Sequence, residues 1–211
     1  MKTKISNISL IEVLTLFFSC TAVWISWNGQ NYVEAAYISN KKLIVYSERY
    51  KDNPEITKLI PIGDNKKILS VRISYPDKFI KNVDYIDASG LYASTENINI
   101  NIARMLKKDI KDNSISFSIP VELLTKYAVD GDVFYDNSIY FITYKINLEK
   151  EKDSNYKVIT YESQFEFASR IPDSITYSLI RRVFGEDETM DINKMFETNS
   201  YWSSLDFVRS L

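Results

Sequence analysis

Three aspartates in a short stretch are the residues best suited to carry chemistry in this sequence. Asp130 and Asp132 flank Gly131, and Asp136 follows four residues later. Two carboxylates at this spacing offer the oxygen ligands that a hard divalent cation prefers. Asp and Gly also form turns readily, so a surface turn explains the same residues and is the favoured interpretation. An EF-hand loop is excluded, because Phe134 stands where an oxygen ligand is needed. Asp130, Asp132 and Asp136 are therefore weak candidates for a metal site.

The composition excludes several classes of enzyme. The 211 residues contain no histidine, which is the commonest general base and transition-metal ligand. Cys20 is the single cysteine, so an internal disulfide and a thiolate zinc site are ruled out. Catalysis by carboxylates, lysine or tyrosine stays open in principle, but no nucleophile–base pair and no Gly-rich phosphate loop is recognisable. We therefore expect a protein that is not an enzyme and that carries no cofactor.

The charge balance argues against nucleic acid as a partner. The chain has 26 basic and 28 acidic residues, which gives a formal net charge of −2. Nucleic-acid binding favours a strongly basic surface, whereas the lysines and arginines here are scattered along the chain. A chain of this length, with 45% hydrophobic residues, is long enough to bury a core as one domain.

The segment Ile8–Trp27 has the length and composition of a membrane-spanning helix. Its only charged residue is Glu12, and at about 1.5 Å per residue it spans roughly 30 Å, the thickness of a hydrocarbon core. Tryptophans at its C-terminal end suit the membrane interface. We predict a transmembrane helix over residues 8–28, anchored in lipid by large apolar side chains: Ile8, Leu10, Leu14, Phe17, Phe18, Trp24 and Trp27.

Two other interpretations of this segment stay open. One is a helix buried in a protein core, although such a helix normally carries a polar face. The other is a lipoprotein signal, because Phe17-Phe18-Ser19-Cys20 loosely resembles a lipobox that ends at the lipidated cysteine. The apolar run continues past Cys20 to Trp27, whereas lipoproteins usually turn polar at that point.

A further interpretation rests on the residues SLIEVL, which follow the short basic leader MKTKISN. This start resembles that of type IV prepilins and pseudopilins. The resemblance implies a filament subunit whose mature chain begins at Ile8 and whose assembly residue is Glu12. Asn7 stands where that family strongly prefers Gly. A carboxylate in lipid seeks a cationic partner, such as a neighbour's amino terminus, or else snorkels to the headgroups.

The charges around this segment predict its orientation. Lys2 and Lys4 lie in the tail formed by residues 1–7, and the positive-inside rule places such a tail in the cytoplasm. The soluble domain is then expected outside the cytoplasm, tethered to the cell membrane. Residues 29–42 favour a helical stalk between the anchor and that domain.

Alternation with a period of two dominates residues 43–170 and predicts an antiparallel, sandwich-like β domain. A charged loop, EKEKDSN, separates the last two alternating runs and indicates a hairpin. The segment Asn97–Ile102 alternates Asn with Ile and is also predicted to be a strand. The residues expected on one face of each remaining strand are Leu69, Val71, Ile73 and Tyr75; Ile115, Phe117 and Ile119; Tyr140, Ile142, Tyr144, Ile146 and Leu148; and Ile159, Tyr161, Phe165 and Phe167.

Short helices are predicted around this β domain. Pro120 opens the segment PVELLTKY, and proline suits the first position of a helix because its missing N–H is not needed there. Residues 171–211 are expected to form a helical segment packed on the β domain. Within it, helices are predicted over Asp173–Phe184, over Asp191–Phe196 and from Ser203.

These features together predict a non-enzymatic, single-pass membrane protein whose β domain binds or senses a partner. The expected partners are the lipid bilayer and either another protein or a second copy of this chain. The alternatives are the pilin-like filament subunit and a membrane-acting effector or toxin, for instance in bacterial defence.

Overall fold

The computed structural model describes residues 10–51, 53, 55–106, 110–150, 156–171 and 191–198. Between residues 10 and 41 it describes the side chains of residues 14–27, 29 and 41. The chain forms two compact units, Met1–Lys42 and Leu43–Leu211, each of which is considered by itself below.

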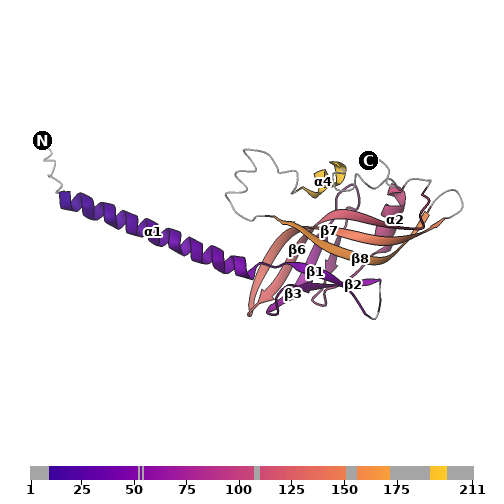
Figure 1. Cartoon of the computed structure of the whole chain (residues 1–211), viewed down its shortest axis with the longest axis horizontal. Helices are drawn as coiled ribbons and strands as arrows, with labels where there is room; N and C mark the ends of the chain where they lie inside the picture. The colour runs from indigo at the N-terminus through magenta and orange to yellow at the C-terminus, as the bar shows by residue number, and fades with distance from the viewer. Residues whose placement is uncertain are drawn as a thin grey trace. The chain divides into compact units, whose positions relative to one another are not determined.

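The first unit contains one long helix, α1, which runs over Leu10–Lys41 (Figure 1). The backbone is therefore helical from Leu10 of the predicted anchor to Lys41 of the predicted stalk. Hydroxyl groups inside α1 are satisfied locally, since Ser19 Oγ donates to the Thr15 carbonyl and Thr21 Oγ1 to the Phe17 carbonyl, each at 2.8 Å. Such bonds to a preceding turn remove most of the cost of placing a hydroxyl in an apolar setting.

The transmembrane interpretation of residues 8–28 is not supported by the structure. Within the part of the chain that it describes, no helix is long and apolar enough to cross a membrane. Ile8 lies outside the described residues, as do the side chains of Leu10 and Glu12.

The second unit is mainly β and holds two antiparallel sheets, which confirms the predicted fold class at that level (Figure 1). The larger sheet has the strand order β4-β3-β6-β7-β8, and the smaller has the order β1-β2-β5. The strands of the larger sheet are β3 (Lys66–Ser74), β4 (Val83–Ile86), β6 (Ser114–Val129), β7 (Asp132–Lys150) and β8 (Tyr156–Arg170). Those of the smaller sheet are β1 (Val45–Arg49), β2 (Ile56–Pro61) and β5 (Leu91–Ala93).

The core of this unit is built from the alternation seen in the sequence. Along β6 and β7 every second side chain is buried, and the predicted inward faces of both strands are confirmed. Side chains from the smaller sheet, such as Val45, Leu59 and Tyr92, belong to the same hydrophobic cluster. Both sheets therefore share one core, as expected where an antiparallel sheet keeps one face dry.

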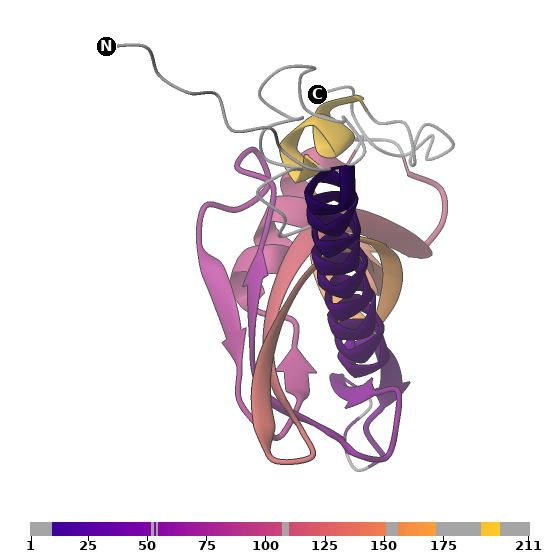
Figure 2. The same cartoon turned by 90° about the vertical axis from the view of Figure 1, so that its left-hand side faces the viewer.

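A two-residue turn joins β6 to β7, which form a long curved hairpin (Figure 2). Val129 pairs with Asp132, and the two residues between them both have positive φ, 53° at Asp130 and 95° at Gly131. These are the dihedral signs of a type I′ turn, whose twist matches that of the flanking strands. The turn interpretation of Asp130 and Gly131 is thereby confirmed.

A β-bulge in β8 changes which of its side chains are buried. The register with β7 shifts between Lys145 and Ile146, and Tyr161 is left without an opposite residue. An extra residue reverses the alternation of the strand on one side of it. Phe165 is buried as predicted, but Val158 and Thr160 are buried in place of Ile159 and Tyr161.

A bulge in β3 has the same effect near the start of that strand. The register with β6 shifts between Ile68 and Ser70, so Ile68 is buried and Leu69 only partly so. Beyond the bulge, Val71, Ile73 and Tyr75 are buried as predicted.

The segment predicted as a strand at Asn97–Ile102 is instead part of helix α2, which runs over Glu96–Met105. Ile98 and Ile102 are both 0% exposed, and residues four apart lie on the same face of a helix. Ile100 lies away from that face and is 42% exposed. The prediction was wrong because alternate isoleucines contain a spacing of four as well as a spacing of two.

The helix predicted from Pro120 is also wrong, since β6 passes through this residue without a break. Pro120 pairs with Phe141 of β7, whereas the ladder between β3 and β6 ends at Glu122. Pro120 thus lies beyond the last residue that β3 pairs, at a position where a strand tolerates the loss of an N–H donor.

The C-terminal region contains helix α4, Ile192–Thr198, which confirms the short helix predicted near Asp191–Phe196. The Asp191 carboxylate caps it by accepting from the backbone N–H of Asn193 at 2.9 Å. Phe196 is 0% exposed, and its ring centroid lies 6.0 Å from that of Phe79, so α4 packs on the β domain. The helices predicted over 173–184 and from 203 lie outside the described residues. The predicted hairpin is confirmed, because β7 and β8 pair antiparallel.

Candidate functional site

Strand β8 forms an edge of the larger sheet, because β7 is the one strand among the described residues that pairs with it. Side chains of the smaller sheet cover part of this edge of β8, on its side away from β7. Thr57 Oγ1 donates to the Ser163 carbonyl at 2.6 Å, and the Phe165 N–H donates to Ser47 Oγ at 2.9 Å. Covering an edge in this way satisfies its main-chain groups and blocks pairing with another strand.

The first residues of β8 line a groove of about 370 Å³, and helix α2 forms the facing wall. A volume of this order is typical of a binding pocket, in which a few polar groups are set among apolar ones. The groove is lined by Glu96, Asn99, Ile100 and Ala103 from α2 and by Tyr156, Lys157, Val158 and Ile159 from β8.

Hydrogen bonds hold both walls of this α2–β8 groove. Thr160 Oγ1 donates to Asn99 Oδ1 at 2.6 Å and so ties β8 to α2. The Tyr156 hydroxyl accepts from the Ile110 N–H at 3.0 Å and donates to the Ile110 carbonyl at 3.2 Å. The groove is thus preformed, which lowers the entropic cost of binding a ligand there.

The chemistry of the α2–β8 groove suits binding. Its described lining contains no serine, threonine, cysteine or histidine that could act as a nucleophile or as an imidazole base. Ile100 presents an exposed apolar side chain on the helical wall, and Glu96 and Lys157 place one charge of each sign on opposite walls. Lys157 also lies 3.8 Å from Glu149 in an ion pair that is well exposed to solvent.

The three aspartates proposed as a metal site do not converge. Asp130 Oδ1, in the β6–β7 turn, accepts from Asn65 Nδ2 at 3.1 Å. Asp136 lies farther along β7, where its side chain is 6% exposed and its Oδ1 lies 2.6 Å from Arg170 Nε. Among the described residues, no three acidic, histidine or cysteine side chains are grouped so that they could hold a metal ion.

Asp136 and Arg170 instead form the centre of a structural cluster. Ser138 Oγ donates to the second oxygen of Asp136, and Arg170 Nη2 donates to the Leu43 carbonyl. The Val45 N–H donates to the buried Tyr140 hydroxyl at 3.0 Å. These contacts join the first residues of the second unit to β7 and to the end of β8.

A second polar cluster lies in the core and was missed in the sequence, where its tyrosines could not be told from ordinary core residues. The Tyr92 hydroxyl lies 2.8 Å from that of Tyr144 and 3.2 Å from that of Tyr75. The Tyr75 hydroxyl donates to Asp84 Oδ2 at 2.7 Å. Burial raises the pKa of all three tyrosines well above the usual value, so their hydroxyls stay protonated at neutral pH.

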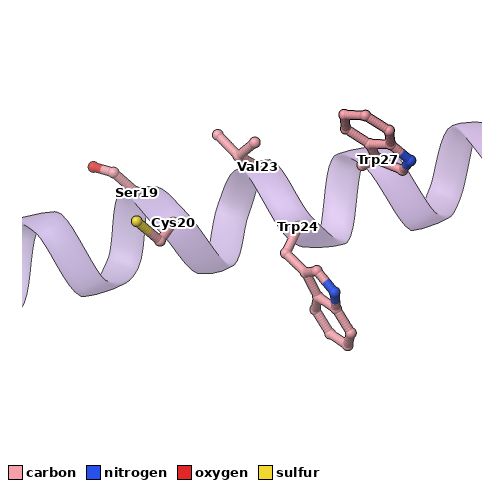
Figure 3. Close-up of a pocket in the computed structure, with 5 residues that line it drawn as sticks. All are labelled: Ser19, Cys20, Val23, Trp24 and Trp27. Carbon is pink, nitrogen blue, oxygen red and sulfur yellow. The ribbon is translucent and has the colours of Figure 1, made fainter.

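The described side chains among the predicted anchor residues are exposed on α1. Leu14 is 47% exposed, and Phe17, Phe18, Trp24 and Trp27 are each 62% to 68% exposed. A shallow hollow on the same helix is bounded by Ser19, Cys20, Val23, Trp24 and Trp27. In Figure 3 Val23 and Trp27 lie on one side of the helix and Trp24 on the other, so these side chains radiate outward and enclose no cavity.

Comparison of the chain with protein-family models, with curated proteins and with solved structures gave no match. The candidate site therefore rests on its own geometry. Its residues were not singled out in the sequence, because α2 was expected to be a strand. The signal that could have found the helix is the pair Ile98 and Ile102 at helical spacing, after the N-cap residue Thr95.

Proposed function

We propose that the protein is a non-enzymatic, membrane-attached binding protein. In this proposal α1 inserts its apolar side chains into a lipid bilayer, and the β domain binds a partner in the α2–β8 groove. The observation that carries it is the exposure of α1: Leu16, Phe17, Phe18, Val23, Trp24, Ile25 and Trp27 are each more than 60% exposed.

Lipid is the environment that relieves this exposure. Moving one large apolar side chain out of water is worth about 1.5–3 kcal/mol. The tryptophans lie toward the end of the apolar stretch that leads to the β domain, where their rings suit the interface.

Attachment to lipid can be tested with full-length protein by flotation with phosphatidylcholine vesicles on a density gradient. The wild type is expected to float. Replacing Phe17, Phe18 and Trp24 together with serine removes about 5–9 kcal/mol of transfer free energy and is expected to leave the protein at the bottom. The matched control replaces Val83 and Tyr85, which are also exposed but lie on β4, and this variant is expected to float like the wild type.

The result that overturns membrane attachment is a wild-type chain that stays monodisperse in water and does not float. An intact mass measured on protein from native membranes distinguishes this proposal from the pilin-like alternative. A full-length mass agrees with the proposal, whereas a chain beginning at Ile8 would establish the pilin-like filament subunit in its place.

A further inference from the structure

We propose that the partner of the α2–β8 groove is an extended peptide, which adds as a further strand to the part of the β8 edge that no other described strand pairs with. This inference rests on the proposed binding function and names the class of partner for the same site. It follows from three features: the direction of the main-chain groups of β8, the facing wall of α2, and the dimensions of the groove.

The direction of the main-chain groups follows from the register of β8 with β7. In an antiparallel pair, alternate residues direct their N–H and C=O groups toward the neighbouring strand and away from it. Ser163 directs these groups away from β7, since its carbonyl accepts from Thr57 of the smaller sheet. Ser163 pairs with Tyr144 of β7, and Thr160 and Val158 pair with Ile146 and Leu148, which follow Tyr144 at steps of two residues.

Thr160 and Val158 therefore also direct their main-chain groups away from β7. The bulge at Tyr161 does not change this, because the register is followed along the regular strand β7. No strand among the described residues pairs with this part of the β8 edge. A row of such groups is a template for a further strand, as in peptide recognition by strand addition.

The facing wall offers apolar contact beside this template. Ile100 of α2 is 42% exposed and lines the groove together with Ala103. Ile98 and Ile102, on the other face of the same helix, are fully buried and pack α2 against the core. Ile100 takes no part in that packing, so its replacement is expected to leave α2 folded. An apolar side chain of the bound peptide is expected to pack on Ile100 and exclude water from it.

The dimensions and charges of the groove favour a peptide over an anionic ligand. Tyr156–Ile159 extends over about 13 Å at 3.3 Å per residue, which is enough to pair with four or five peptide residues. Glu96 and Lys157 are of opposite sign, so the groove lacks the single-sign field that concentrates phosphate or nucleic acid.

The test uses the full-length protein in detergent micelles and a random 12-residue peptide library displayed on phage. Peptides are expected to be enriched on the wild type and to bind Ile100→Asp about tenfold or more weakly, because the charge lies where an apolar side chain packs. The matched control is Val83→Asp, which changes an exposed apolar residue on β4, at the opposite edge of the same sheet. This control is expected to bind the peptides like the wild type.

Strand addition is then tested on one enriched peptide by methylating its backbone nitrogens one at a time. Methylation is expected to weaken binding about tenfold at every second position and little at the positions between, because only alternate N–H groups meet β8. Binding that depends on Ile100 but shows no alternation would overturn strand addition and leave groove binding in place. Failure to enrich peptides, or binding that Ile100→Asp leaves unchanged, would overturn the peptide inference, while flotation decides membrane attachment independently.

Discussion

Two clusters in the β domain pair buried polar groups, and they do so with different chemistry. One is an ion pair, in which Asp136 and Arg170 approach to 2.6 Å. The other is a chain of neutral hydroxyls from Tyr75, Tyr92 and Tyr144, which ends on the carboxylate of Asp84. Both give hydrogen-bond partners to polar groups that are shielded from water, as buried polar groups require. They differ in which group is left without a partner when one member is removed.

The difference is one of charge. Removing Arg170 would leave a carboxylate that is 6% exposed without its counter-ion. Removing the Tyr144 hydroxyl would leave the neutral Tyr92 hydroxyl with one hydrogen bond fewer, while both rings keep their apolar contacts. The ion pair is therefore expected to behave as a unit, and the tyrosine chain as a set of smaller contributions.

The largest effect is expected from Arg170→Met. Stranding the Asp136 carboxylate should lower the free energy of unfolding by about 3–5 kcal/mol. This change is measured by urea unfolding of the full-length protein in micelles, with the circular dichroism signal of the β-strands as the readout. The double variant Asp136→Leu/Arg170→Met is expected to recover much of the loss, because no buried charge remains. A single variant that loses less than about 1 kcal/mol would remove the distinction between the clusters.

High pH should act on the tyrosine chain and spare the ion pair. The pKa of Tyr75, Tyr92 and Tyr144 is raised by burial, and that of Tyr140 to about 12. Below the unfolded pKa of about 10 both states are protonated and stability is complete. As pH rises past 10 the unfolded chain ionises first, so stability falls by about 1.4 kcal/mol per pH unit for each such tyrosine.

Urea midpoints between pH 8 and pH 11 check this dependence. The absorbance of tyrosinate at high pH supplies the control, because burial raises the pKa of Tyr75, Tyr92 and Tyr144 and their hydroxyls should ionise only above the usual range of tyrosine. Simultaneous titration of all tyrosines in the folded protein would contradict the burial of the hydroxyl chain.

A smaller loss is expected from Tyr144→Phe. The change removes the hydroxyl that lies 2.8 Å from that of Tyr92 and keeps the ring in place. The expected cost is about 1–2 kcal/mol, measured by the same urea unfolding. Tyr85→Phe is the matched control, since Tyr85 is 72% exposed and its replacement should change stability by less than about 0.5 kcal/mol.

The smallest effect is expected from an ion pair at the surface. Lys78 and Glu197 lie 3.3 Å apart with side chains 56% and 48% exposed. Lys78→Ala is expected to cost less than about 1 kcal/mol, and 1 M salt should abolish the difference from the wild type. If Lys78→Ala lowered the free energy of unfolding as much as Arg170→Met, burial would not explain how much each ion pair contributes to stability in this fold.

The alternation of apolar residues was sufficient to predict the start of β6 (residues 114–119) and the middle of β7 (residues 140–148), because every second side chain there is buried in the core. Alternation was insufficient where a β-bulge adds one residue to a strand, and where the same apolar residues also fit the spacing of a helix. The bulge at Tyr161 reversed which face of the first part of β8 is buried. Ile98 and Ile102 have a spacing of four, which is compatible with one face of a helix as well as with one face of a strand. Residue types in these segments do not encode the register of a neighbouring strand.

The candidate groove could not be predicted for the same reason. Its two walls are α2 and β8, whose lining residues Ala103 and Tyr156 are separated by more than fifty positions in the sequence. Only the packing of α2 beside the edge of β8 brings them together. The aspartates near residue 130 show the converse, since the Asp-Gly turn was evident from local chemistry whereas the ion pair of Asp136 with the distant Arg170 was not.

By itself the sequence determined the features that depend on near neighbours: the helix of α1, the mainly β character of the second unit, the Asp130-Gly131 turn and the short helix α4. Each follows from propensity or periodicity over a few residues. The tertiary structure alone decided which residues β-bulges bury, that Pro120 lies within a strand, and that α2 packs beside the edge strand β8. These outcomes depend on contacts between distant segments, where the free energy gained by filling one common core outweighs local preference.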